Sequence, residues 1–209
     1  TSGVSGETLS LTGSGVLGAA SAGTQTVTNN NTLAIADGSG LASNYTLSGA
    51  TINVTIIPRT LNVTLSREYD GTTTVSGGSL TPTFDSLQGG ETLALSGTGS
   101  VSTANVGSSK AVSLGSIALA AGSGNPSNYT LNSATMDITQ RVINLDGIRA
   151  FDGTTNVLSS DINTFGNIVS GETLSISGAG SVGTNSVAMN KVITTGSLSL
   201  GNGSGLASN

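Results

Sequence analysis

One pattern constrains this chain more than any other: its motifs return at a fixed period. Gly-Glu-Thr-Leu begins at positions 6, 90 and 171, so its copies are 84 and then 81 residues apart. Asn-Tyr-Thr-Leu begins at 44 and 128, again 84 residues apart. Gly-Ser-Gly-Leu-Ala-Ser-Asn at 38–44 returns unchanged at 203–209. A shared period of this kind indicates a repeat protein and outweighs any domain count based on length alone.

The period predicts three copies, of which only the middle one, residues 59–140, is complete. The first copy, 1–58, lacks the opening strand and the Tyr-Asp-Gly turn, and the last copy, 141–209, lacks the final strands. We therefore expect the chain to be a window on a longer repetitive polypeptide.

A turn motif opens the complete unit. Tyr69, Asp70 and Gly71 are followed by two threonines, and a degraded copy with Phe151, Asp152 and Gly153 lies 82 residues further on. Asp accepts hydrogen bonds from nearby backbone in turns and Gly tolerates positive φ, so Asp-Gly is a strong turn signal. The motif predicts a strand end, a tight turn and a new strand.

Composition excludes several classes of function. The chain has no Cys and no His, which removes thiolate chemistry, the usual general base and the commonest metal ligand. Its net charge of −5 gives no basic patch for nucleic acid. No apolar run approaches the roughly 18 residues that span a membrane, so we expect no membrane insertion in this segment. We expect neither a cofactor nor enzyme activity.

Alternation of apolar and polar residues predicts about seven short strands in the complete unit, and no segment has a sustained helical period. The candidates are Thr60–Ser66, Leu80–Leu87 (at a sheet edge, because it contains Pro82), Glu91–Ser96, Lys110–Leu114, Ser116–Ala120, Tyr129–Leu131 and Ala134–Thr139. Such alternation is typical of an antiparallel sheet with one buried face. The predicted fold is a row of all-β, immunoglobulin-like antiparallel sandwiches, with a β-solenoid or β-grasp-like unit as the alternative.

The junctions between copies carry a further signal. Ile52, Val54 and Ile56 occupy even positions, whereas the next apolar residues are Leu61, Val63 and Leu65. Because side chains alternate faces along a strand, this switch predicts that the buried face flips between copies. Short junctions with such a flip indicate a stiff rod of domains.

The complete unit resembles the Tyr-Asp-Gly ("YDG") repeats of large secreted bacterial adhesins related to filamentous haemagglutinin, of the two-partner-secretion type. The residues that match are Tyr69–Thr73, Gly90-Glu91, Asn105-Val106-Gly107, Lys110-Ala111-Val112 and Asn128-Tyr129. Phe151 departs from the pattern, as does Thr26, which stands where Lys is expected. The resemblance implies an exported, extracellular or cell-surface protein of stalk or fibre type.

Several residues have a chemical and a structural interpretation. Lys110, Glu91 and Asn128 could be assigned to an isopeptide crosslink, although a solvated or ion-paired Lys is the commoner case. Asp70, Asp152 and Glu91 could bind Ca²⁺, but they are scattered singly and better explained as turn residues. Tyr45 and Tyr129 are expected to be core anchors whose hydroxyls bond nearby backbone.

The leading functional hypothesis is a structural segment of an adhesin stalk or biofilm-matrix fibre, whose partners are neighbouring repeats. The second is an adhesion module that binds a glycan or a host protein, against which the low aromatic content counts. A third is a filament of like chains, assembled by strand pairing at open sheet edges.

Overall fold

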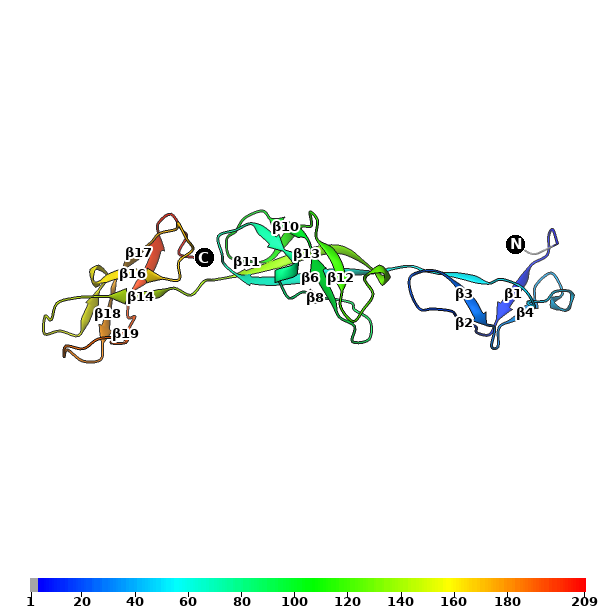
Figure 1. Ribbon diagram of the computed structural model, residues 1–209, viewed down its shortest axis with the longest axis horizontal. Helices are drawn as coiled ribbons and strands as arrows, with labels where there is room; N and C mark the ends of the chain where they lie inside the picture. The colour runs from blue at the N-terminus through cyan, green and yellow to red at the C-terminus, as the bar shows by residue number, and fades with distance from the viewer. Residues whose placement is uncertain (1–3) are drawn as a thin grey trace. The chain divides into compact units, whose positions relative to one another are not determined.

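The computed structural model describes residues 4–209, and its regular elements there are β-strands and single turns of 3-10 helix (Figure 1). The all-β class is therefore confirmed. Residues up to 58 contain β1 (Leu9–Thr12), β2 (Val16–Leu17), β3 (Gly23–Asn29), β4 (Ala34–Asp37), η1 (Ala42–Asn44) and β5 (Asn53–Ile56). Residues 59–140 contain β6 (Arg59–Glu68), β7 (Thr74–Ser76), η2 (Gly77–Ser79), β8 (Thr83–Phe84), β9 (Leu93–Ser96), β10 (Thr98–Val101), β11 (Gly107–Ser113), β12 (Ala118–Ala121), η3 (Pro126–Asn128) and β13 (Tyr129–Thr139). The remainder contains β14 (Asn144–Gly147), β15 (Asn156–Leu158), η4 (Ser159–Asp161), β16 (Ile162–Gly166), β17 (Leu174–Ser177), β18 (Ala179–Val182), β19 (Ile193–Thr194) and β20 (Ser199–Asn202).

These residues form two compact units. The first comprises the described residues up to Leu61, together with Ser86–Leu93 and Leu119–Asn132. The second comprises Asn62–Asp85, Ala94–Ala118 and Ser133–Asn209. Each unit is described by itself below.

In the first unit, two small antiparallel sheets lie in residues 4–58. Strand β1 pairs with β4, with Leu9 opposite Asp37, and β2, β3 and β5 form a three-stranded sheet. The β1–β4 pairing has a counterpart in the second unit, where β17 pairs with β20 and Leu174 lies opposite Asn202. The same pairing thus recurs where Gly-Glu-Thr-Leu recurs.

The complete copy is built on a six-stranded sheet in the order β7-β10-β11-β13-β6-β8, which curls into a half-barrel (Figure 1). The apolar side chains of β6 line its concave core: Leu61, Val63 and Leu65 are 0%, 2% and 1% exposed. Met136 and Ile138 of β13 are equally buried. The alternation of β6 and its buried face are therefore confirmed.

Strands β6 and β13, which are neighbours in this sheet, run parallel to each other. Bonds join Ser133 to Asn62, Thr135 to Thr64 and Thr139 to Arg67, in the same order along both strands. The other strand pairs for which a register is defined are antiparallel. No immunoglobulin-like repeats are identified. Alternation in the sequence did not distinguish the two folds, because alternating residues line a curled sheet as well as they line a sandwich.

In the last copy, the second unit contains three further antiparallel sheets: β14-β16, β15-β18-β19 and β17-β20. The core is thinner here, since the buried apolar residues of this copy are Val157 and Ile162, which are 5% and 7% exposed. The loop between β18 and β19 leaves Val187, Met189 and Val192 at least 84% exposed. A large part of the apolar surface of this copy therefore stays in water.

Candidate functional site

The Tyr-Asp-Gly motif forms a tight turn after β6, as predicted. Asp70 Oδ1 accepts hydrogen bonds from the backbone N–H and the hydroxyl of Thr72, both at 2.9 Å. Gly71 has φ of 76°, in the left-handed region that favours glycine. The chain then enters β7, which lies at the far edge of the sheet from β6, so the turn does not close a hairpin.

The degraded copy keeps this turn geometry. Asp152 Oδ1 accepts the backbone N–H of Thr154 at 2.9 Å, and Gly153 also has φ of 76°. The Thr154 N–H lowers the pKa of the Asp152 carboxyl below its usual value. Arg149 pairs with Asp152 at 2.6 Å, as Arg67 pairs with Asp70 at 3.2 Å. The two carboxylates are 42% and 50% exposed, and ion pairs this open to solvent stabilise a turn only slightly, so the acids are turn residues in both copies.

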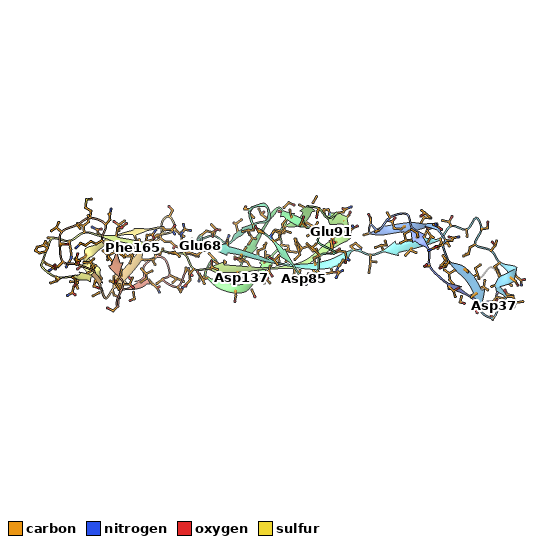
Figure 2. All side chains as sticks on the ribbon, turned by 90° about the horizontal axis from the view of Figure 1, so that it is seen from below. Asp37, Glu68, Asp85, Glu91, Asp137 and Phe165 are labelled. Atoms are coloured by element: carbon orange, nitrogen blue, oxygen red, sulfur yellow. The ribbon has the colours of Figure 1, made fainter. Side chains whose placement is uncertain are left out.

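The glutamate of Gly-Glu-Thr-Leu binds a tyrosine hydroxyl. Tyr129, which is 7% exposed, donates to Glu91 Oε2, and its oxygen accepts the backbone N–H of Gln88 at 3.2 Å. In the first copy Tyr45 donates to Glu7 Oε2 at 2.5 Å. Glu91 lies just before β9 and is labelled in Figure 2. Tyr129 is thus a buried anchor, and its hydroxyl bonds a carboxylate as well as backbone.

Tyr69 makes the same kind of bond to a residue of the next copy. It is 6% exposed and donates to Glu172 Oε1. Arg141 holds the turn from the other side, by donating to the Tyr69 carbonyl at 3.1 Å and pairing with Glu68 at 3.5 Å. A β-carbon on Gly71 would lie 2.8 Å from a methyl of Val169. In the second unit, the Tyr-Asp-Gly turn therefore packs against the copy that follows it.

Phe151 does not repeat this arrangement. It is 67% exposed, and it has no hydroxyl to donate. The aromatic position of the motif is thus buried in one described copy and solvated in the other.

Asn128 reaches back to the preceding copy. Its Oδ1 accepts the backbone N–H of Ala22 at 2.8 Å. At the equivalent place in the second unit, Asn209 Oδ1 accepts the N–H of Val106 at 3.1 Å. Both acceptors belong to the same motif position, and both donors lie in the loop before the equivalent strands β3 and β11.

The residues considered for a crosslink have other hydrogen-bond partners. Lys110 Nζ donates to the Thr103 hydroxyl and to the Asn105 carbonyl, both at 2.8 Å. Glu91 is bonded to Tyr129, and Asn128 is bonded to the Ala22 amide. Lys110 closes its own loop, and Lys191 does the same by donating to the Thr184 carbonyl at 2.6 Å.

A pair of residues not predicted from the sequence supports each glutamate. In each copy a Thr and a Ser that lie 31 residues apart exchange backbone and side-chain hydrogen bonds. The pairs are Thr8 with Ser39, Thr92 with Ser123 and Thr173 with Ser204. The signal was present in the sequence, because Gly-Ser-Gly follows Gly-Glu-Thr-Leu at this constant distance in all three copies.

Beside Tyr69 and Glu172, the second unit has a shallow cavity of about 230 Å³, with aliphatic walls that include Leu174, Leu200 and Leu206. Within residues 4–209 no group of three or more Asp, Glu, His or Cys could hold a metal ion. No helix in that range is long and apolar enough to cross a membrane. The described contacts are hydrogen bonds that connect strands, turns and neighbouring copies.

Comparison with known families finds a YDG domain at residues 55–136, which covers most of the complete copy. No curated protein and no solved structure matches the chain. The YDG domain therefore contains Tyr69, Glu91 and Tyr129, whose contacts are described above.

Raising the pH above about 10 is expected to remove the stability that the tyrosine hydroxyls provide. The bond to Glu91, followed by burial, raises the pKa of Tyr129, and Glu7 and Glu172 raise the pKa of Tyr45 and Tyr69 in the same way. A folded-state pKa above the unfolded value gives stability that is complete below the unfolded pKa. That stability is lost as the pH rises through the folded-state pKa.

Tyr129→Phe isolates one of these bonds. The variant should unfold at a lower urea concentration than the parent chain near neutral pH, and this difference should shrink at about pH 11. Circular dichroism at both pH values measures the two midpoints. A difference that stays constant with pH would show that the lost hydroxyl acts only through packing.

Proposed function

We propose that the chain is a structural repeat segment of an extracellular bacterial adhesin stalk or matrix fibre, to which it gives length and stiffness. The observation that carries the proposal is the recurrence of one set of structural contacts. The Thr–Ser exchange occurs in all three copies, and the Asn that reaches back to a loop amide occurs in both units. The chain thus repeats contacts that connect its strands and its neighbouring copies, and a stalk of stacked repeats needs such contacts.

The YDG domain at residues 55–136 supports the proposal, because repeats of this type are those that the sequence resembles in large secreted adhesins. The short connections support it as well. Only Ile57 and Pro58 separate β5 from β6, and proline restricts the backbone at that point. The proposed role is mechanical and requires neither a catalytic group nor a cofactor.

Electron microscopy of the cells that make this chain tests the proposal. Antibodies raised against residues 1–209, coupled to gold, are expected to decorate thin surface rods with a regular axial spacing. Gold inside the cells would overturn the extracellular assignment. Thick bundles of many chains would instead support a filament assembled through strand edges.

A glycan array separates the stalk from an adhesion module. The chain is expected to give no reproducible binding. Binding that is abolished by substitutions in one loop, and not by substitutions in another, would replace the stalk with a binding module of defined surface.

A further inference from the structure

The glutamate of Gly-Glu-Thr-Leu has the same orientation in all three copies. A β-carbon on Gly40, Gly124 or Gly205 would lie 2.6, 2.8 or 2.7 Å from Oε2 of Glu7, Glu91 or Glu172. Oxygen Oε2 therefore faces the Gly-Ser-Gly turn in every copy, and a side chain at this glycine would force the carboxylate to shift. In the last copy the other oxygen, Oε1, faces Tyr69.

The two oxygens accept from tyrosines of different origin. In the first and middle copies Oε2 accepts the hydroxyl of the Asn-Tyr-Thr-Leu tyrosine of the same copy, Tyr45 or Tyr129. In the last copy Oε1 accepts the hydroxyl of Tyr69, which belongs to the Tyr-Asp-Gly turn of the preceding copy. A carboxylate has about four lone-pair sites, so the two bonds do not compete for one acceptor.

The side chain of Asn128, the residue before Tyr129, forms its hydrogen bond with the preceding copy. Asn128 ends the single turn η3, and Tyr129 begins β13. Tyr129 reaches its own Glu91, whereas Asn128 reaches the Ala22 amide of the preceding copy. Asn209 makes the equivalent bond to Val106, and its side-chain amide also donates to Asn105 at 3.2 Å.

We propose that this glutamate is the joint between consecutive copies: it accepts one tyrosine hydroxyl from its own copy on Oε2 and one from the preceding copy on Oε1. We call this arrangement the two-tyrosine joint. Its bond to the preceding copy is the one between Tyr69 and Glu172, and the Asn209 bond to Val106 lies in the same unit. The inference rests on the proposed stalk function and names the residues that make the stalk stiff.

The joint explains why Tyr-Asp-Gly and Gly-Glu-Thr-Leu occur in the same repeat. The hydroxyl of Tyr69 has its acceptor 103 residues away, and in the second unit Arg141 and Val169 hold the turn at the correct place. A copy with Phe at this position, as at Phe151, cannot donate to a following glutamate. A joint with Tyr at this position therefore has a hydrogen bond to the glutamate that a joint with Phe lacks.

Pulsed electron paramagnetic resonance on the full chain tests the joint. Because the chain has no Cys, two introduced cysteines take spin labels at defined sites. Ser113→Cys on β11 and Thr164→Cys on β16 are exposed strand positions of the second unit, one on each side of the joint. The expected result is a narrow distribution of label separations that broadens at least twofold with Tyr69→Phe and with Glu172→Gln.

Tyr129→Phe is the matched control, since it removes the same atom from a tyrosine–glutamate bond inside one copy. It should lower the urea midpoint and leave the distribution narrow. Equal broadening by both tyrosine variants would show a general loss of packing and overturn the joint. A wild-type distribution as broad as that of Tyr69→Phe would overturn it as well.

A second variant tests whether one carboxylate holds two hydroxyls. The chain is extended after Asn209 by Tyr-Thr-Leu, which copies Tyr129–Leu131. The added tyrosine is expected to raise the urea midpoint while the distribution stays narrow, because it occupies Oε2 and leaves Oε1 to Tyr69. If the added tyrosine displaces Tyr69, the distribution broadens and the two-tyrosine joint is wrong. None of these outcomes depends on where the protein is located, so a failed joint and a failed stalk assignment are distinguishable.

Discussion

Replacing Leu61 by Ala is expected to lower the free energy of unfolding of the six-stranded sheet by about 3 kcal/mol, within a range of about 2–5 kcal/mol. Leu61 is fully buried at the start of β6, beside Val63 and Leu65 on the same face. Truncation removes apolar area from the core and leaves a cavity, and both effects destabilise the fold. Leu61 is among the most buried side chains of this copy, with Leu65, Val75 and Met136, so the truncation falls in the best-covered part of the core.

Urea denaturation followed by circular dichroism measures the Leu61→Ala effect, with the transition of the sheet resolved from those of the other copies. Thr60→Ala is the matched control, because it changes the adjacent, exposed residue of the same strand. The control should shift the free energy of unfolding by no more than about 0.5 kcal/mol. If the two variants were equally stable, β6 would not be a core strand of this sheet.

The second large effect is expected from Gly97→Ala, at about 2 kcal/mol or more. Gly97 has φ of 77°, which is costly for any residue with a β-carbon, and such an atom would collide with the backbone carbonyl of Ser116. A backbone carbonyl cannot rotate away as a flexible side chain can. The turn between β9 and β10 would have to move, and Thr98 would lose its bond to the Ser116 hydroxyl at 2.9 Å.

Gly78→Ala, in η2, is the control for the Gly97→Ala substitution. Gly78 is exposed, has no positive φ, and its β-carbon would meet nothing within 4 Å. Thermal unfolding of both variants gives the comparison, with a large drop in Tm for Gly97→Ala and almost none for Gly78→Ala. A similar drop at Gly13→Ala or Gly178→Ala is expected as well, because these equivalent glycines have φ of 81° and 90° and face Thr32 and Ser197 in the same way.

Local patterns predicted the strands with clear alternation. The odd positions of β6 are buried as expected, and β8, which follows Pro82, lies at a sheet edge as expected. Strand β8 is only Thr83–Phe84, shorter than the predicted Leu80–Leu87. Strands β7 and β10 were missed, because three residues are too few to show a period and Gly97-Thr98-Gly99 indicated a break. The break is the turn at Gly97, and β10 begins at the next residue.

Local sequence patterns could not predict the order of the strands in the sheet. A parallel β6–β13 pair joins the two ends of the copy, and alternation along each strand does not specify which strand lies beside it. The same limit applies to the site. The sequence indicated that Tyr69, Glu91, Asn128 and Tyr129 recur or define motifs, but not that Tyr69 bonds a glutamate of the next copy. Only the constant distance between Thr92 and Ser123 could have indicated how the glutamate is held.

The parallel pairing of β6 and β13 has a mechanical consequence. One strand begins the complete copy and the other ends it, and hydrogen bonds join them as neighbours in the sheet. Tension applied through the chain pulls these two strands in opposite directions along their own axes. The bonds between them are then loaded in shear and share the force, whereas a hairpin pulled at its open end unzips one bond at a time. In this geometry, rupture of the copy requires the whole row of bonds to yield together.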